Sequence, residues 1–452
     1  MKVITPFHKI CALSGVVVVG LIASQAALAS GYAIKENSAS LLGRAFAGSA
    51  SASGDLSTIH YNPATLALVE GREVSFSGTY VDPTIKAKNA EGFGPETPFG
   101  AEPVGGRTSD DNAALSGVIP AGYLGWNWRD DINFGVAVTS PWALGTNYHD
   151  NWSGNLYALK SELTSVNINP MVSYRFNKKL SVAAGVQAQY LEATLTKQAW
   201  LPAAPFPPSP ATAVHSKVTG NDWGYGYNLG LLYEFSEMTR VGLSYQSAIH
   251  QTLEGDATGV SDSTPDPTLN LGLGGALTGT SKANIVTPEN VNFSITHGFN
   301  EKWTGHAGVQ WTRWNRFHDL TVDIENPNYV GGEISSTVDE KWDNTFFYNL
   351  GVDYQLNPDW VFRAGVAFDE SPIDDDYRTP ALPDGDRTWL SIGAGYNFAE
   401  CGRIDVGYSY VFVEDVSVDL NDSNPNNAAS GSLTADYESN VNIVGVSLSW
   451  TF

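Results

Sequence analysis

Gly445-Val446-Ser447-Leu448-Ser449-Trp450-Thr451-Phe452 ends the chain as a strict alternation of apolar and small polar residues. Successive side chains of a β-strand point to opposite faces, so this segment has one apolar face and one polar face. The same pattern recurs upstream without a matching helical period, for example in Leu390-Ile392-Ala394-Tyr396-Phe398. Repeated alternation of this kind is typical of a closed barrel with lipid outside and a polar lumen inside. We therefore predict an all-β, transmembrane antiparallel β-barrel.

Residues 1–29 have the features of a secretory signal peptide. Lys2 and Lys9 give a positive start, an apolar stretch follows, and Ala27-Leu28-Ala29 offers small residues for cleavage before Ser30. No later stretch approaches the roughly 20 consecutive apolar residues of a membrane helix. An exported chain built of alternating strands is expected in the outer membrane of a Gram-negative cell.

Turn lengths alternate along the chain and give the number of strands. Six short links and seven long loops join about 14 strands over residues 72–452. Short turns are expected on the periplasmic side and long loops outside. The short links are centred on Asp130, Lys178, Glu237, Glu301, Pro358 and Cys401.

Residues 30–71 differ from the rest because they are rich in Ser, Ala and Gly and lack sustained alternation. We expect short helical pieces and turns. A lumen of this size would leak if empty, because barrels of about 16–18 strands already form open channels. The segment is therefore predicted to be a hatch inside the lumen; a flexible periplasmic tail is the alternative.

The formal charge of −23 excludes nucleic acid as a partner, since nucleic-acid binding needs a basic surface. Many acids crowd between Asp369 and Asp386. We interpret them as solvated loop charges rather than a calcium site that bridges to lipopolysaccharide, and we predict no metal site. No zinc-ligand spacing, phosphate loop or Gly-x-Ser-x-Gly elbow occurs, so neither a cofactor nor enzymatic activity is predicted.

Several strings occur in a fixed order along the mature chain: Leu42-Gly43-Arg44-Ala45-Phe46-Ala47-Gly48, Asn62-Pro63-Ala64, Phe368-Asp369-Glu370-Ser371-Pro372 and Pro383-Asp384-Gly385-Asp386-Arg387. In this order they resemble the FadL-type family of outer-membrane long-chain fatty-acid channels, which includes relatives that take up toluene and xylene. The resemblance implies a 14-stranded barrel with an N-terminal hatch. It also implies an outer entry groove, an inner site that touches the mature N-terminus, and a lateral opening beside the third strand.

The family's functional positions can be carried onto this sequence. The hatch motif falls on Asn62, Pro63 and Ala64, and the N-terminal residues that reach the inner site fall on Tyr32 and Ile34. Lys197 is at a position that should face the lumen in the alternation of its strand, and it lies where the family often places a basic residue. At a second position where some relatives have a basic residue, this chain has Thr321. Two further inward positions are candidates for the inner site: Arg363, which more often pairs with a lumen carboxylate, and Trp389, which could equally pack against the hatch.

The third strand carries an independent argument for the lateral opening. Its alternating pattern meets Ser140, Pro141 and Trp142. Proline cannot donate to a ladder and is excluded from central strands except at bulges, and every strand of a closed barrel is central. Pro141 is expected to open a gap in the wall; a strand that simply ends at its loop is the alternative.

The outer loops are unusually apolar. An exposed apolar patch usually marks a binding surface, so these loops predict an outer groove; loops that pack on each other and cap the barrel are the alternative. The residues of the predicted groove are Trp200, Leu201, Phe206, Leu269, Leu271 and Leu273.

These features together predict a passive channel for hydrophobic molecules, with long-chain fatty acids as the first candidate ligand. Aromatic hydrocarbons or alkanes are the alternative, and a general porin is the second alternative. Outer-membrane lipid and lipopolysaccharide are expected neighbours, and the barrel-assembly machinery is an expected partner during biogenesis. A self-contained barrel has no edge that demands a partner, so a monomer is expected.

Overall fold

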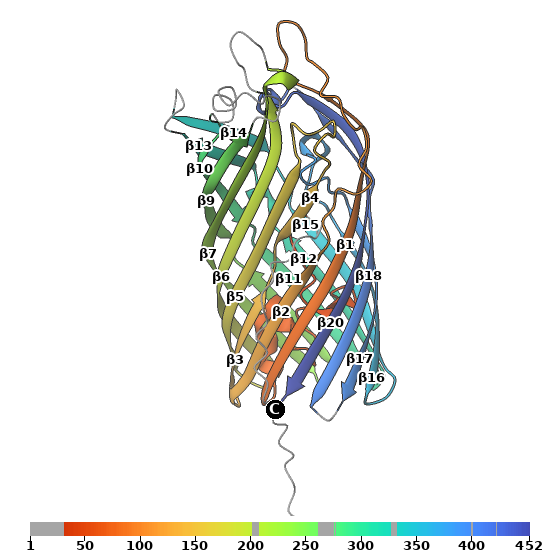
Figure 1. Ribbon diagram of the computed structural model, residues 1–452. Helices are drawn as coiled ribbons and strands as arrows, with labels where there is room; N and C mark the ends of the chain where they lie inside the picture. Colours follow the sequence, from red (N-terminus) through yellow and green to blue (C-terminus); the bar gives the residue numbers. More distant parts are fainter. Residues whose placement is uncertain are drawn as a thin grey trace, which may run out of the picture.

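The computed structural model describes residues 31–200, 208–260, 275, 277–326, 332–398, 401–421 and 423–452. Most of them belong to one antiparallel sheet that curls into an upright barrel (Figure 1). The strands are β1 (Arg72–Phe93), β2 (Gly117–Arg129), β3 (Ile132–Thr139), β4 (Ala143–Asn147), β5 (Lys160–Arg175), β6 (Leu180–Trp200), β7 (Ala213–Ser236), β8 (Thr239–Gln246), β9 (Ile249–Val260), β10 (Gly279–Thr287), β11 (Asn290–Gly298), β12 (Trp303–Thr312), β13 (Asp319–Glu325), β14 (Glu333–Asp339), β15 (Thr345–Gln355), β16 (Trp360–Asp369), β17 (Arg387–Phe398), β18 (Gly402–Val413), β19 (Val416–Leu420) and β20 (Ser432–Thr451). The helices are α1 (Ala39–Leu42), α2 (Thr58–Tyr61), η1 (Pro63–Leu68), η2 (Pro210–Thr212), η3 (Trp314–Arg316), η4 (Asp375–Tyr377) and η5 (Pro425–Asn427).

The sheet closes on itself because β1 pairs with β2 on one side and with β20 on the other. Some strands of the wall carry two labels because their ladders are interrupted, as in β3 with β4 and β8 with β9. With such pairs joined, the barrel has 14 antiparallel strands. The predicted fold class and strand count are therefore confirmed.

Short and long connections separate to the two ends of the barrel, as predicted. The turns β2–β3, β5–β6 and β15–β16 lie at the end that carries the C-terminus, and the long connections lie at the opposite end (Figure 1).

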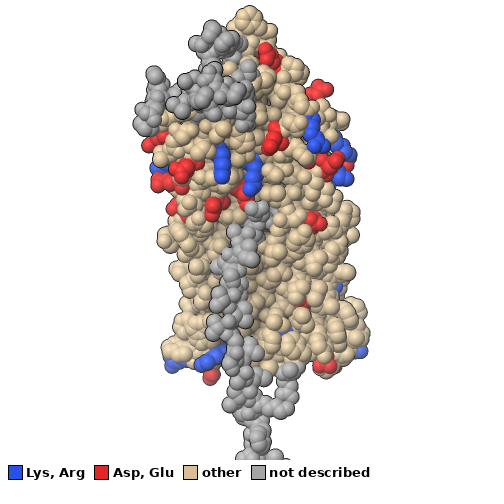
Figure 2. Space-filling view, viewed as in Figure 1, with Lys and Arg blue, Asp and Glu red and all other residues tan. Residues whose placement is uncertain are grey.

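Side chains along each strand alternate between an exposed outer face and a buried inner face. In β16, Phe362 and Val366 are exposed, whereas Val361 and Ala367 are buried. Figure 2 shows that charged side chains gather toward the two ends and leave a broad middle zone with few of them. An apolar band between charged rims is what a bilayer requires of a barrel wall. No helix in the described ranges has the length and apolar character needed to cross a membrane.

Residues 31–69 lie inside the barrel and are mostly buried. Helix α1 packs on β17, β18 and β20, and η1 packs on β5, β6 and β7. Ser38 is the N-cap of α1, and its hydroxyl accepts a hydrogen bond from the amide of Leu41. The small residues of this segment allow its backbone to approach the wall closely.

The barrel strands have glycines, which have no side chains, where α1 and the residues after it lie against the wall. A Cβ added to Gly393 of β17 would lie 2.8 Å from the Cα of Gly43, and one added to Gly365 of β16 would meet the backbone of Arg44. Gly393 pairs in register with Gly407 of β18. The glycines are thus needed for backbone-to-backbone contact between the segment and the barrel.

Candidate functional site

The wall is incomplete beside the third strand. β3 pairs with β2 as far as Val138, which lies opposite Gly122. Hydrogen bonding between the two sides resumes only where the Leu115 amide donates to the Gly145 carbonyl at 3.1 Å. Between these points no ladder joins β2 to residues 139–144 in the part of the chain that the structure describes.

Two prolines border this gap from opposite sides. Pro141 lies between β3 and β4, and Pro120 lies within β2. Extending the β2–β3 register places Ser140 opposite Pro120. Neither proline has an amide hydrogen to donate to a ladder. The strand does not end at Pro141, because β4 continues to pair with β5 from Ala143 onward.

The N-terminal segment fills the place of the missing pairs. Ala33 forms an isolated antiparallel bridge with Trp142. The Ile34 amide donates to the Pro141 carbonyl at 2.7 Å, and the Ala143 amide donates to the Tyr32 carbonyl at 3.0 Å. Buried backbone groups that β2 leaves unpaired are therefore satisfied by residues 32–34.

Tyr32 extends from this bridge into an aromatic cluster. Its ring lies 4.8 Å from that of Trp314 and 5.6 Å from those of Trp142, Phe317 and Trp342, mostly edge to face. Its hydroxyl donates to the Val286 carbonyl at 3.1 Å. Edge-to-face contacts of this kind favour one orientation of each ring, and Tyr32 is only 3% exposed.

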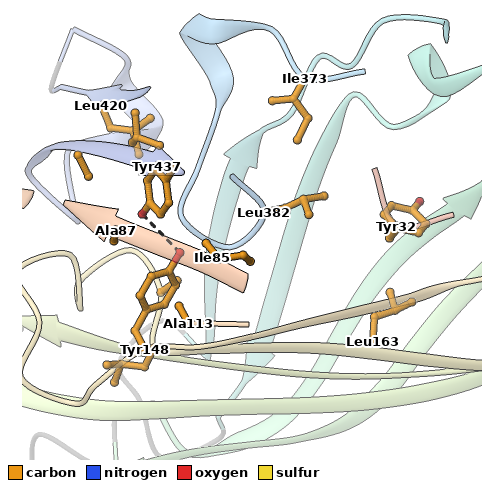
Figure 3. Packing of buried hydrophobic residues seen from close by; sticks show 14 of the residues in the cluster. Tyr32, Ile85, Ala87, Ala113, Tyr148, Leu163, Ile373, Leu382, Leu420 and Tyr437 are labelled. Atoms are coloured by element: carbon orange, nitrogen blue, oxygen red, sulfur yellow. Dashed lines mark hydrogen bonds between the residues drawn. The ribbon is translucent and has the colours of Figure 1, made fainter. Parts of the chain in front are cut away.

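A cavity opens beside Tyr32 and contains about 830 Å³ of space between atoms, including its mouth. The part of this space that a water molecule can enter measures about 100 Å³. Figure 3 shows Tyr32, Leu163 and Leu382, all of which line the cavity, around the same space. The lining also includes aliphatic side chains, among them Leu253 and Ile285.

Glu340, in the loop before β15, also lines the cavity and is 9% exposed. The indole nitrogen of Trp342 donates to its Oε2 at 2.8 Å. Burial raises the pKa of Glu340 to about 8, although the Trp342 hydrogen bond acts in the opposite direction. The site therefore combines a large apolar surface with the carboxyl group of Glu340, whereas Glu162, the other acid that borders the cavity, pairs with Lys160.

The residues predicted for the inner site are divided between two clusters. Tyr32 belongs to the cluster around the cavity, whereas Ile34 and Trp389 belong to a second, deeper cluster with Phe46 and Phe347. The Trp389 ring lies 6.1 Å from that of Phe46. Trp389 thus packs against the segment inside the barrel. This is the second of the two roles considered for it, the first being to line the inner site.

The two predicted cations are not in the cavity wall. Arg363 points inward, but its Nη1 lies 2.8 Å from Asp405 Oδ1, and it belongs to a buried network with Asp353 and Arg44 near the short-turn end. Lys197 faces inward on β6 two positions beyond Leu195, which lines the cavity while Lys197 does not. Arg363 is therefore corrected to a structural ion pair, and Lys197 is placed above the cavity.

Thr321 needs a similar correction. Its neighbours Leu320 and Val322 line the cavity, so Thr321 lies on the other face of β13, where its hydroxyl is 2.8 Å from that of Thr337. Its identity therefore contributes nothing to the charge of the inner site.

Asn62, Pro63 and Ala64 fasten the inner segment to the wall. The Asn62 side-chain amide donates to the carbonyls of Ala50 at 2.7 Å and Leu231 at 3.1 Å, and its oxygen accepts from the Ala64 amide at 3.0 Å. Pro63 occupies the first position of η1, where its missing amide hydrogen costs nothing.

The predicted outer groove is only partly visible. Trp200 is buried against Leu156 and Ala213 rather than displayed on an open surface, as expected for loops that cap the barrel. The other residues of the predicted groove lie outside the described residues: Leu201, Phe206, Leu269, Leu271 and Leu273.

The acidic loop between β16 and β17 contains buried groups that sequence reasoning treated as solvated. The Asp384 carboxylate accepts from the Gly31 amide at 3.0 Å and from Ser371 at 3.1 Å, and it pairs with Arg387. Lys35 pairs with Asp369 at 3.3 Å. The strings that contain these acids were noticed in the sequence, but their role in holding residues 31–35 was missed. Among the described residues, no group of three or more His, Cys, Asp or Glu is placed to hold a metal ion.

Comparison with known proteins places these features in a family. A long-chain fatty acid transport protein of Escherichia coli O6:H1 is 28% identical over 423 residues, which cover 88% of this chain and 90% of that protein. The fold matches the crystal structure of a Pseudomonas aeruginosa FadL homologue with a TM-score of 0.82 at 24% identity, covering 93% of this chain and 100% of that one. It also matches the Ralstonia pickettii toluene transporter TbuX with a TM-score of 0.65 at 18% identity, covering 91% of this chain and 98% of that one.

Members of this family are transporters or channels rather than enzymes, and its proteins reside in the outer membrane. The family model for the outer membrane protein transport proteins of the OMPP1/FadL/TodX type matches residues 20–452, so the chain belongs to this family of outer-membrane β-barrel transporters.

Proposed function

We propose that the protein is a passive, hatch-gated channel that takes up hydrophobic molecules and releases them sideways through its wall. One observation carries this proposal: residues 32–34 fill the gap beside Pro141, and Tyr32 of the same segment borders the inner cavity. A movement of this one segment would connect the cavity to the gap.

In this proposal, residues 1–29 are removed as a signal peptide, residues 30–71 form the hatch and residues 72–452 form the barrel. A ligand is first captured by the apolar outer loops and then occupies the cavity beside Tyr32. Displacement of Tyr32 and Ile34 uncovers the gap, and the ligand leaves between β2 and the segment that contains Ser140, Pro141 and Trp142.

Burial of apolar surface supplies the binding energy, at about 0.8 kcal/mol for each CH₂ group. A molecule that leaves through the wall enters the hydrocarbon phase directly and avoids water. The concentration gradient and later consumption of the ligand are sufficient to drive uptake.

Long-chain fatty acids are the first candidate ligand, by similarity to the E. coli protein and its name. Aromatic hydrocarbons or alkanes are the second candidate, supported by the ring cluster around Tyr32 and by the fold shared with a toluene transporter.

The test is uptake by a deletion strain that carries the gene on a plasmid. Radiolabelled oleate and toluene should enter faster with the plasmid than without it, for at least one of the two ligands. The purified protein should show no large steady conductance in a planar bilayer. Large steady currents together with unchanged hydrophobic uptake would refute the proposal and favour a general porin.

A further inference from the structure

Two acids, Glu162 and Glu340, and one lysine, Lys282, are among the residues that line the inner cavity. Glu162 pairs with Lys160, whereas no described cation pairs with Glu340. Glu340 is in its wall, and the indole of Trp342 donates to one carboxylate oxygen. No described residue donates a hydrogen bond to the other oxygen, Oε1. Glu340 can therefore accept one more hydrogen bond on the side of the cavity.

The cations of the surrounding elements are paired elsewhere or face away. Lys282 is among the residues that border the cavity, but its side chain is half exposed and its Nζ lies 3.7 Å from Glu254 on the outer face. Arg313 and Arg316 both pair with Glu289. Arg378 pairs with Asp375 and donates to the Asp384 carbonyl.

The remaining candidate is Lys197, which lies beyond the cavity wall on β6. An anionic head group inside the cavity would thus be desolvated beside Glu340 without a positive partner. Isolated charges in apolar surroundings are strongly disfavoured, whereas an uncharged hydroxyl needs only one hydrogen-bond partner.

We propose, on the basis of the uptake function above, that the inner site binds its ligand in an uncharged form and that Glu340 accepts a hydrogen bond from a hydroxyl head group. Long-chain alcohols and apolar phenols have the required chemistry, and a fatty acid would enter in its protonated form. Tyr32, Phe317 and Trp342 would surround the end of the ligand next to Glu340.

Other ionisable groups near Glu340 do not reverse this argument. Asp339 and Lys341 flank it in the chain, and Lys341 Nζ lies 2.9 Å from the Tyr377 hydroxyl. The Tyr32 hydroxyl is occupied by Val286. His318 faces solvent, with its ring 66% exposed, and contacts Glu340 only through its carbonyl, which accepts from the Glu340 amide at 3.0 Å.

The experiment measures the Kd of dodecanol and of dodecanoate from intrinsic tryptophan fluorescence of the mature protein in detergent at pH 9, where dodecanoate is anionic. Ligand partition into micelles is the same for every variant, so the ratio of variant to wild-type Kd isolates the effect of the site. The variants are Glu340→Gln and Lys197→Met. Glu254→Gln is the matched control, because it removes an acid from the outer face next to cavity-lining Leu253.

We expect Glu340→Gln to lower the Kd of dodecanoate about tenfold, the effect of roughly one pK unit of interaction, and to leave the Kd of dodecanol within about threefold. Lys197→Met and Glu254→Gln should leave both constants within about threefold. The wild type gives a second measurement: its Kd for dodecanoate should rise between pH 6.5 and pH 9.5, while its Kd for dodecanol stays constant.

If Lys197→Met weakens dodecanoate binding tenfold while Glu340→Gln has no effect, the ligand is held as an anion and this inference fails, although the uptake function stands. If the wild type binds neither ligand, this inference is overturned, whereas the proposed function is decided separately by the uptake of oleate and toluene.

Discussion

The amide of Ile34 donates a hydrogen bond to the carbonyl of Pro141 at 2.7 Å, so the segment inside the barrel takes the position of a missing neighbouring strand. This bond joins two features that lie more than a hundred positions apart in the sequence. It makes the state of the wall depend on the position of the N-terminal segment.

Restoring amide donors on both sides of the gap should close the wall. The double variant Pro120→Val/Pro141→Val can form the ladder hydrogen bonds that proline prevents. Uptake of the hydrophobic ligand should fall at least tenfold, while the barrel still migrates as a heat-modifiable band on gels. Pro170→Val is the control, because Pro170 lies in β5 opposite Val136 and away from the gap between β2 and residues 139–144. Equal uptake by the double variant and the wild type would mean that the gap is not the exit.

A side chain at Gly393 should dislodge α1 from the wall. A Cβ there would lie 2.8 Å from the Cα of Gly43, which is backbone and cannot move aside cheaply. Gly393→Val should therefore raise the single-channel conductance and the sensitivity of cells to large hydrophilic antibiotics. At Gly78 of β1 a Cβ would meet nothing within 4 Å, so Gly78→Val should cause neither change. Unaltered conductance in Gly393→Val would contradict the fit described here.

The ion pair between Arg44 and Asp353 fastens the inner segment near the short-turn end. Arg44 Nη1 lies 2.7 Å from Asp353 Oδ2, and the side chain of Arg44 is only 3% exposed. Asp353→Asn leaves the guanidinium buried without its carboxylate, and loss of one partner of a buried pair costs about 3–5 kcal/mol. We expect faster protease cleavage of residues 39–55 from the periplasmic side. Glu301→Gln, in the nearby exposed turn, is the control; identical cleavage rates for the two variants would argue against a fastening role.

Glu36 makes the stability of the inner segment depend on pH. It is fully buried, neither of its carboxylate oxygens has a hydrogen-bond partner in the described structure, and burial raises its pKa from 4.5 to about 7. An acid whose pKa is higher in the folded state contributes stability below pH 4.5, and this contribution is lost as the pH rises through about 7. The thermal unfolding midpoint of the wild type should therefore decrease by a few degrees between pH 4.5 and pH 8. Glu36→Gln should remove most of this decrease; an identical pH profile would show that Glu36 does not titrate in this range.

The barrel could be predicted from the sequence because lipid on one side of every strand enforces alternation directly. The final strand, Ser432–Thr451, shows this clearly: Val444 and Val446 are exposed, and Ile443 and Ser447 are buried. Turn lengths then gave the number of strands.

The interior could not be predicted in the same way, because its contacts join segments that are distant in the chain. Nothing in the local pattern indicates that Asp384 holds the Gly31 amide, or that Glu340 and Tyr32 line the same cavity. The alternation of inward and outward residues cannot be counted through a segment that is not a regular strand. The helix η3 precedes β13 in this way, and Thr321 of β13 faces away from the cavity. Inward glycines in neighbouring strands, such as Gly393 and Gly407, were a usable signal that was missed.

The most direct measurement locks the N-terminal segment to the third strand. Ala33 and Trp142 form an antiparallel bridge in which the neighbouring residues, not these two, make the hydrogen bonds. In a non-hydrogen-bonded pair of this kind the two Cα atoms lie about 4.5 Å apart, closer than in the hydrogen-bonded kind. In a Cys401→Ser background, Ala33→Cys/Trp142→Cys should form a disulfide on oxidation. Uptake of the hydrophobic ligand should be abolished in the oxidised protein and recovered when the same cells are treated with dithiothreitol. Equal uptake before and after reduction, with the disulfide verified by mass spectrometry, would contradict the claim that residues 32–34 must leave the wall for the ligand to pass.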